Sequence, residues 1–403
     1  MLTWRLSYRN LFRHKTRLAL NLCLLVGAFS AIVLFKGFKQ YVLDMMKENK
    51  IETQYGHIEV AKNKFWNNAP VDQVSEKMLQ SPKELAAAVA QMPEVQFASA
   101  RLSFYGLINT EDKSMPAQFI GFDPKVESKM QSHLLLTDGV AFQDSKSAIV
   151  GKGLAQLLKI KAGSDVTIVS PTLNGGINAM DIHVNGIFST GFTDIDNSAV
   201  FLPLQDGEKI LDTEQADQLI IKLKDEKDIN DVVGKIKQLK TEDGVQVKHW
   251  YDLADLYNQV KDFYNFQNAV IEFILIALLV LSVSNTTNMT IFERLSEIGT
   301  LRALGDYESD VQKLFILESL FLGALAVIVG IPVSYILVQI VSGLHIPIVL
   351  PFTSRAIPMT MVPTTWAYVE AALVCFFSVI LASLWPAKKG AATSIVTALR
   401  AKI

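Results

Sequence analysis

Four apolar runs dominate the pattern of hydrophobic and polar positions along this chain, at residues 18–35, 273–292, 319–342 and 371–387. About 20 apolar residues, each rising 1.5 Å along a helix, cross the roughly 30 Å hydrocarbon core of a membrane. The pattern therefore predicts four membrane-spanning helices. Glu272, Glu318 and Glu370 each stand just before one of the runs, which places them near a membrane boundary and argues against a proton relay.

Residues 1–17 have the pattern of a helix that lies on a membrane surface. Arg5, Arg9 and Arg13 recur at every fourth residue and share one helical face, while Trp4 and Tyr8 lie on another face. A simple basic flank would explain the charges but not the aromatic spacing. The apolar run that follows is longer than the core of a typical signal peptide, so we expect an uncleaved anchor.

The segment between the first two spans alternates polar and apolar residues like a soluble α+β domain. A strand-like run at 55–61, a helix at 83–92 and strand-like runs at 95–108 and 116–122 are followed much later by the same order at 217–223, 226–240 and 245–250. We interpret these as two halves of a split β-α-β domain. A β-rich insertion at about 124–205 interrupts them. Its loops at 172–180 and 189–197 suit recognition surfaces and plain hairpin tips equally well.

Basic residues predict the orientation in the membrane. They crowd before the first span, and Lys388 and Lys389 follow the fourth, whereas the loop at 343–366 has only Arg355. Because basic residues favour the cytoplasmic side, both termini should be cytoplasmic and the domain at 41–265 should lie on the other side.

The composition of the chain limits the kinds of partner and reaction that it can have. Half of the residues are apolar, 19% are charged and the formal net charge is −2, which disfavours nucleic acid as a partner. Cys23 and Cys375 both lie in apolar runs, so we expect two buried packing thiols. No phosphate-binding loop, H-E-x-x-H or G-x-S-x-G motif occurs. We therefore assign no catalytic residue, no metal site and no cofactor to this chain.

The connector between the second and third apolar runs has more charged residues and more helical character than a short tether would need. Residues 292–305 read FERLSEIGTLRALG. As a helix this stretch directs Leu295, Ile298, Leu301 and Leu304 toward apolar contacts and sets Glu293 and Glu297 one turn apart. A rigid charged knob of this kind could transmit force from a cytoplasmic partner. A juxtamembrane helix that only reverses the chain explains the pattern equally well.

Three motifs in this sequence are similar to one family. The run E293-R294-x-x-E297-I298-G299-x-x-R302-A303-L304-G305 resembles the signature of the permease superfamily that includes the lipoprotein-releasing and macrolide-exporting ABC transporters and the cell-division permease. The basic opening SYRNLFRHKTR and the closing PAKKGAATSIVTALRA are also similar, although Ile395 stands where the family usually has proline. The outer half looks most like the lipoprotein-releasing branch.

The resemblance implies a membrane protein with four transmembrane helices and a large α+β extracytoplasmic domain between spans 1 and 2. The parts are an interfacial helix at 1–17, spans at 18–40, 266–291, 312–342 and 367–387, a periplasmic domain at 41–265, a cytoplasmic coupling helix at 292–311, an outer loop at 343–366 and a tail at 388–403. The implied location is the bacterial inner membrane.

The resemblance also implies how such a chain works. Two four-span subunits, identical or sister chains, pair with a dimer of cytoplasmic ABC ATPases, which bind the ATP and magnesium and hydrolyse the ATP. The implied mechanism is mechanotransmission, and the residues that would couple the ATPase are Glu293, Arg294, Glu297, Ile298, Gly299, Arg302 and Gly305. The favoured function is the release of lipoproteins. The alternatives are an exporter of a peptide or small toxic molecule with a periplasmic adaptor, and a signalling scaffold that transports nothing.

Overall fold

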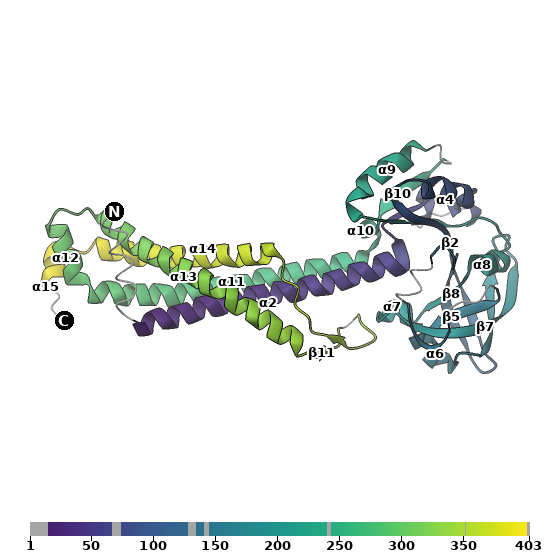
Figure 1. Cartoon of the computed structure of the whole chain (residues 1–403), viewed down its shortest axis with the longest axis horizontal. Coiled ribbons are helices and arrows are strands. Elements are labelled where there is room, and N and C mark those ends of the chain that lie inside the picture. Colours follow the sequence, from purple (N-terminus) through teal and green to yellow (C-terminus); the bar gives the residue numbers. More distant parts are fainter. Residues whose placement is uncertain are drawn as a thin grey trace. The chain divides into compact units, whose positions relative to one another are not determined.

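A computed structural model describes residues 15–66, 74–127, 134–140, 145–239, 243–350 and 352–400 (Figure 1). The residues predicted to form the interfacial helix, Trp4, Arg5, Tyr8, Arg9 and Arg13, lie outside the described part. The chain divides into two compact units. We call the first the helical unit (Met1–Asp44, Val260–Pro347, Pro358–Ile403) and the second the sheet-rich unit (Met45–Gln259, Ile348–Ile357).

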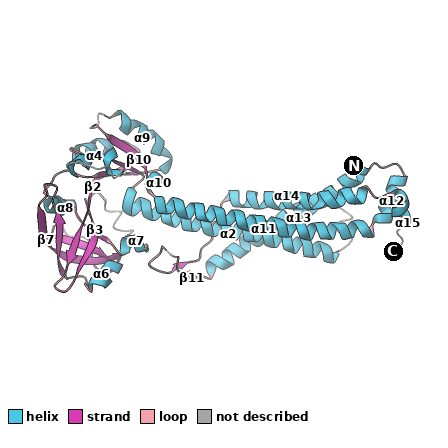
Figure 2. Cartoon of the chain, turned by 180° about the vertical axis from the view of Figure 1, so that it is seen from behind, coloured by secondary structure: helices cyan, strands magenta, loops and turns pink. Residues whose placement is uncertain are grey.

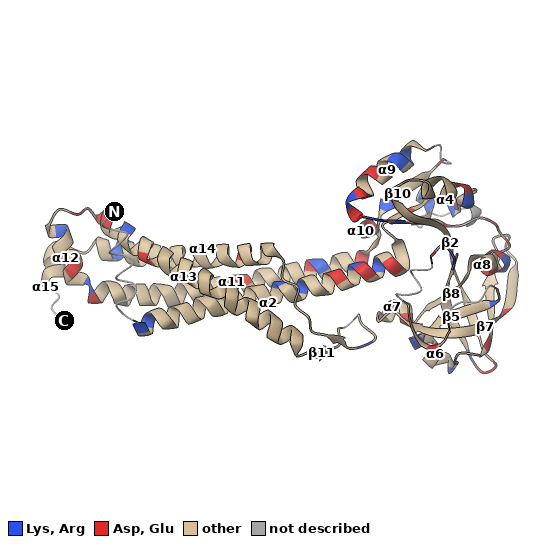
Figure 3. Ribbon diagram, in the orientation of Figure 1, with Lys and Arg blue, Asp and Glu red and all other residues tan. Residues whose placement is uncertain are grey.

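Long helices form most of the helical unit. They are α2 (Lys15–Lys50), α11 (Asp255–Glu293), α13 (Glu308–Gly343) and α14 (Thr365–Ala391), and each is long and apolar enough to cross a membrane. This confirms the four predicted spans. The helices α2 and α11 extend well past the apolar runs, because charged residues end a membrane run without ending a helix. Figure 3 shows long stretches of α13 and α14 without a charged residue.

Small residues let the long helices of this unit pack closely. A Cβ atom on Gly330 would lie 3.0 Å from the ring of Phe29, and one on Gly323 would lie 3.2 Å from the ring of Phe376. Cys375 is buried in this core, as expected, but Cys23 is exposed on α2, so the expectation of two buried thiols is wrong for Cys23. No described residue covers the face of α2 on which Cys23 lies.

The acidic residues at the span boundaries form ion pairs. Lys36 of α2 lies 3.0 Å from Glu272 of α11 and also pairs with Glu370 of α14. Glu318 of α13 pairs with Arg294 at 2.9 Å. Pairing compensates for placing these charges where water is scarce, which agrees with their interpretation as boundary residues.

The sheet-rich unit contains two lobes on one extended sheet (Figure 2). The first lobe comprises β1 (Ile58–Lys62), α4 (Pro82–Ala90), β2 (Val95–Asn109), β9 (Gln218–Leu223), α9 (Ile229–Gln238) and β10 (Val245–His249). Its strands lie in the order β10-β1-β9-β2 and all pair antiparallel. This is the order of a split β-α-β domain and confirms that prediction.

The second lobe is the predicted β-rich part. It comprises β3 (Ser114–Phe122), β4 (Leu135–Gly139), β5 (Ser147–Gly151), α6 (Lys152–Leu158), β6 (Asp165–Pro171), β7 (Ile177–Ser189), α7 (Thr193–Asp196), β8 (Ala199–Pro203) and α8 (Leu204–Leu211). Within it, β3 pairs parallel with β8, and β5 pairs parallel with β7.

This lobe begins earlier than the expected boundary at about residue 124. The first half of β2 pairs with β9, whereas its second half pairs with β3 and β6, with Leu107 opposite Val169. One continuous strand thus serves both lobes. Because β2 runs without a break from Val95 to Asn109, no turn or gap in the sequence pattern marks the point where its partners change.

Short elements complete the chain. They are η1 (Ile51–Tyr55), a π-helical turn after α2, then α3 (Asn63–Trp66), η2 (Val74–Lys77), η3 (Glu226–Asp228), α10 (Trp250–Leu253), α12 (Leu295–Ala303), β11 (Pro347–Ile348), β12 (Ile357–Pro358) and α15 (Ile395–Arg400).

Candidate functional site: the connector after the second span

The connector between α11 and α13 is divided into short pieces. Helix α11 ends at Glu293, Arg294 leaves the helical conformation, and α12 covers Leu295–Ala303. A turn follows, and α13 begins at Glu308. The structure thus replaces the single predicted helix at 292–311 with a break, a short helix and a turn.

Arg294 fills the break and is almost buried, with 8% of its surface exposed. Its guanidinium lies 3.1 Å from Glu297 of α12 and 2.9 Å from Glu318 of α13, above the ring of Phe315. The planar guanidinium serves several partners in a fixed geometry, which suits an almost buried position. Arg294 therefore holds α12 against α13.

Arg302 connects α12 to the end of α14. Its Nη1 donates to the carbonyl oxygens of Ala391 at 2.9 Å and Thr393 at 2.8 Å, and its Nη2 lies 2.9 Å from Glu308. The last carbonyls of a helix have no partner within the helix, and a cation at this end also complements the helix dipole. Arg302 thus caps α14 from the connector.

The two glycines have different roles. A Cβ atom on Gly299 would lie 2.9 Å from the Cβ of Ala398 and 3.2 Å from the backbone nitrogen of Leu399, so Gly299 allows α15 to lie directly on α12. Gly305 has a φ of +110°, which L-residues rarely adopt, and it forms the turn before α13. Ile298 is buried in a small core that includes Phe315.

Glu293 and Glu297 face different surroundings. Glu293 accepts two hydrogen bonds from Arg17 of α2, at 2.7 and 2.5 Å. Glu297 has 44% of its side chain exposed even though it touches Arg294. Leu304, which the sequence placed toward apolar contacts, is 81% exposed, and that expectation is wrong because the turn at Gly305 directs it away from the other helices.

The structure therefore gathers all seven predicted coupling residues in one region, but most of them hold the connector in place. The surface that stays accessible includes the exposed residues Ser296, Glu297, Thr300, Ala303, Leu304 and Tyr307. We call it the outer face of the connector.

Sequence reasoning missed the residues that hold the connector from elsewhere. Arg17, Glu318 and Ala398 lie far from it along the chain, and only the fold brings them there. No spacing rule could have found them, although Arg17 was visible as an uncompensated basic residue before the first span.

A small pocket adjoins the site. It has a volume of about 80 Å³ and is lined by residues of α2, α11 and α13, among them Asn21, Thr286 and Ser319. The hydroxyl of Thr286 lies within hydrogen-bond distance of two acceptors, the side-chain oxygen of Asn21 at 3.2 Å and the carbonyl of Ser282 at 3.0 Å. The threonine thus joins two spans, as polar residues often do in membranes. Among the described residues, no cluster of His, Cys, Asp and Glu side chains could hold a metal ion.

Two family models match this chain. The MacB-like periplasmic core domain matches residues 19–239, more than half of the chain, and the FtsX-like permease C-terminal domain matches residues 269–395. The second match contains the whole connector. The chain belongs to the family of membrane permeases that join a MacB-like periplasmic core domain to an FtsX-like permease domain.

Individual relatives agree with this family. The chain is 31% identical to the ABC transporter permease YtrF of Bacillus subtilis over 30% of this chain and 29% of YtrF. It is 24% identical to the lipoprotein-releasing system transmembrane protein LolC of Neisseria meningitidis over 62% of this chain and 64% of LolC. The aligned region thus spans less than two thirds of either relative. The solved periplasmic region of MacB from Actinobacillus actinomycetemcomitans gives a TM-score of 0.37 at 12% identity, covering 52% of this chain and 95% of that one.

Proposed function

We propose that this chain is the transmembrane subunit of an ATP-driven ABC transporter and that the outer face of the connector docks onto a cytoplasmic ABC ATPase. The observation that carries the proposal is the way the connector is held. Its buried residues are committed to neighbouring helices, whereas Leu304 and Tyr307 are 81% and 76% exposed beside Glu297. Exposed apolar residues next to a charge, at the end of a well-anchored helix and in the turn after it, suit a protein contact.

The anchoring also provides a route for force. A push on α12 reaches α13 through Arg294, α14 through Arg302 and α15 through Gly299. It reaches α2 through the ion pair between Glu293 and Arg17. All four spans therefore respond to one contact, as mechanotransmission requires.

The chemistry of the cycle belongs to the partner in this proposal. A dimer of ATPase subunits binds ATP and magnesium, and this chain supplies docking and movement. It works with a second permease subunit in the bacterial inner membrane, with both termini in the cytoplasm and the sheet-rich unit in the periplasm.

The proposed substrates are lipoproteins, which the complex would release from the inner membrane. The similarity to LolC, whose name states that activity, supports this choice. The match to the MacB-like periplasmic core domain favours a second candidate, an exporter of a peptide or small toxic molecule that works with an adaptor. Depleting the chain separates the two: retention of lipoproteins in the inner membrane supports release, and sensitivity to toxic compounds with normal lipoprotein sorting supports export.

The docking proposal is tested by Glu297→Arg in the complex purified gently from its native membranes. The side chain of Glu297 is 44% exposed and can contact a partner, but it also pairs with Arg294, so the effect of the reversal is interpreted only in protein shown to be correctly folded. We expect the ATPase to be lost from the purified complex and stimulated ATP hydrolysis to fall by about tenfold or more, the size of a contact worth about 1.4 kcal/mol. Mass spectrometry and a hydrolysis assay provide the measurements.

The matched control is Glu214→Arg, the same reversal at an exposed position of the sheet-rich unit. It should leave both the bound ATPase and the hydrolysis unchanged. If Glu297→Arg also retains the ATPase and its full activity while correctly folded, the outer face of the connector is not the docking surface.

A further inference from the structure

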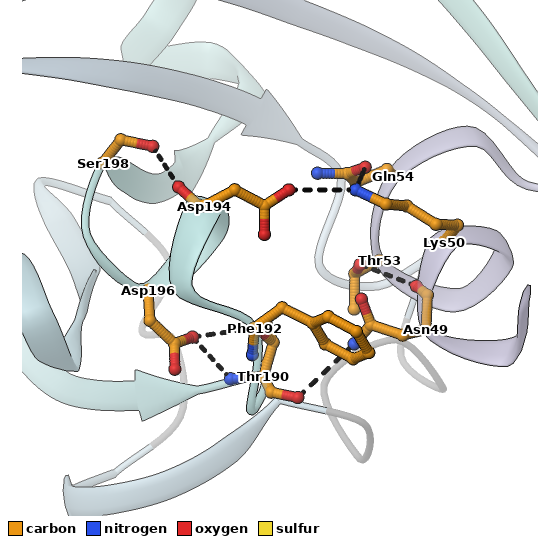
Figure 4. A network of polar contacts seen from close by, with 9 residues as sticks. All are labelled: Asn49, Lys50, Thr53, Gln54, Thr190, Phe192, Asp194, Asp196 and Ser198. Atoms are coloured by element: carbon orange, nitrogen blue, oxygen red, sulfur yellow. Dashed lines mark hydrogen bonds and ion pairs between the residues drawn. The ribbon is translucent and has the colours of Figure 1, made fainter. Parts of the chain in front are cut away.

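The segment that follows β7 is held from two sides within the sheet-rich unit. It comprises residues 189–196 and includes the short helix α7. One side is formed by the end of α2, and the other by residues 352–355, which belong to the loop between α13 and α14. Figure 4 shows the contacts with the end of α2. Both neighbours belong to chain segments that continue into membrane-spanning helices.

Asp196 is the polar centre of this segment and has 1% of its surface exposed. Its carboxylate accepts hydrogen bonds from the Thr190 backbone at 2.7 Å, the Thr190 hydroxyl at 2.9 Å and the Ser189 hydroxyl at 2.7 Å. A fourth donor, the hydroxyl of Ser354, lies at 2.5 Å and comes from the loop. Three donors are thus local and one is distant in the chain.

The rest of the loop contact resembles a short piece of antiparallel sheet. Thr193 donates from its backbone to Phe352, at 3.2 Å, and Ser354 donates from its backbone to Gly191, at 2.9 Å. These bonds flank Phe192 and Thr353, which face each other as a pair that exchanges no hydrogen bonds. The rings of Phe192 and Phe352 stack at an interplanar angle of 11°.

The end of α2 holds the opposite side of the segment. Lys50 is almost buried, and its Nζ lies 3.1 Å from Asp194 of α7 and 2.8 Å from Gln54 (Figure 4). Asn49 donates to the carbonyl of Thr190 at 3.5 Å. One short segment therefore carries contacts from the end of α2 and from the loop that joins the third and fourth spans.

We propose that residues 189–196 and 352–355 form a releasable clasp, which holds the loop between the third and fourth spans on the sheet-rich unit and opens during the transport cycle. The proposal rests on the proposed function for the source of movement.

Two features favour release over a permanent contact. Asp196 keeps its three local donors when Ser354 leaves, so opening the clasp does not strand a buried carboxylate. Loop residues 348–357 belong to the sheet-rich unit, whereas the residues on both sides of them belong to the helical unit. A movement of one unit against the other would therefore pull on the residues that flank the loop, and opening the clasp would relieve that pull.

The first test needs no ATPase. With Cys23 and Cys375 replaced by alanine, Thr353→Cys places a thiol where only 6% of the residue is exposed, so a maleimide reacts with it only when the clasp opens. Adding Ser354→Ala removes the distant donor from Asp196. We expect the labelling rate of the full-length protein to rise by about threefold or more, the effect of losing one hydrogen bond. An unchanged rate in the correctly folded protein overturns the clasp.

The second test follows the cycle in the purified complex with its ATPase. Phe192→Cys with Thr353→Cys places two thiols at a facing pair whose geometry permits a disulfide. We expect oxidative crosslinking to be about fivefold slower in the vanadate-trapped ATP state than without nucleotide, and the crosslink to inhibit ATP hydrolysis until it is reduced. Equal crosslinking rates in both states, with hydrolysis unaffected, overturn the proposal.

The matched control pair is Val169→Cys with Ala179→Cys. These residues face each other across β6 and β7. The backbone of Thr172 donates to Gly176, and facing pairs along an antiparallel ladder alternate between hydrogen-bonded and non-hydrogen-bonded. Counting back from Thr172, Val169 and Ala179 form a non-hydrogen-bonded pair, like Phe192 and Thr353. Their crosslinking should not depend on nucleotide. If no ATPase is present in the complex, the docking proposal fails, and the labelling test alone decides the clasp.

Discussion

At the residue scale, the charged side chains of the helical unit that lie in poorly hydrated places have defined partners. Arg294 binds Glu297 and Glu318, and Lys36 pairs with two carboxylates from different helices. Removing one member of such a pair leaves a charge without its partner, which is why these positions specify how the helices meet. The same reasoning identifies a titratable group in the sheet-rich unit.

Glu59 of β1 is that group. It is 1% exposed and accepts a hydrogen bond from the indole nitrogen of Trp66 at 2.9 Å. Burial raises the pKa of Glu59 to about 7, although the Trp66 hydrogen bond and the charges of Arg101 and Lys248 oppose the shift. The nearby carboxyl of Asp217 has a pKa raised by burial and by the charge of Glu59.

The direction in which Glu59 changes the stability with pH follows from the number of protons bound by the native and the unfolded state. Between the ordinary pKa of about 4.5 and the folded pKa of about 7, the native state holds more protons than the unfolded state. Glu59 therefore lowers the free energy of unfolding as pH rises through this window, by on the order of 3 kcal/mol. We predict that Glu59→Gln raises the unfolding temperature at pH 8 and has little effect at pH 5.

Thermal unfolding of the full-length protein at the two pH values checks this. His57, whose pKa burial lowers to about 4, acts in the opposite direction between pH 4 and 6.5, but it is present in both proteins and cancels in the comparison. Glu214→Gln, an exposed change, provides the control. An equal shift at both pH values would mean that Glu59 does not titrate as described.

At the element scale, the contact between α12 and α15 depends on one missing side chain. Gly299→Ala would bring its new Cβ within 2.9 Å of the Ala398 Cβ. We predict that this change displaces α15 and lowers ATP hydrolysis of the complex, and that Ala398→Gly in the same chain restores part of it because the nearest atom is removed. The expected coupling energy is about 0.5–2 kcal/mol.

A double-mutant cycle measures that coupling, with hydrogen exchange of α15 as a second readout. Simple additivity of the two changes, together with unaltered protection of α15, would show that the helices do not communicate through Gly299.

The elements of this protein were largely predictable from the sequence, because each has a local signal. Apolar length revealed the spans, alternation revealed most of the strands of the sheet-rich unit, and Ser81-Pro82 marked the start of α4 at Pro82. The features that could not be predicted depend on residues far apart in the sequence. The break at Arg294 depends on Glu318, which lies 24 residues away, and the double use of β2 depends on strands from both lobes. Likewise, no residue near Asp196 in the sequence indicates that its carboxylate accepts a hydrogen bond from Ser354.

At the scale of the whole molecule, the four spans are not equally covered by the rest of the chain. Within the most apolar window of each helix, 11% of α11 is buried, against 39–44% for the other three. Lipid can cover the part between Glu272 and Glu293, which rises about 31 Å and matches a hydrocarbon core. Phe263 and Phe266 lie beyond Glu272, away from that core, and are still 63% and 71% exposed.

We predict that these two phenylalanines contact the second permease subunit. A photoreactive phenylalanine analogue at Phe266, about 9 Å beyond Glu272 along the helix, should form a protein adduct in native membranes. The mass of the adduct separates the two arrangements: two copies of this chain indicate a homodimer, and one copy with a different permease indicates a sister subunit. The same probe at Trp366, which is 65% exposed at the start of α14, should react mainly with lipid. Lipid adducts alone at both positions would leave α11 without a protein partner and contradict the paired arrangement.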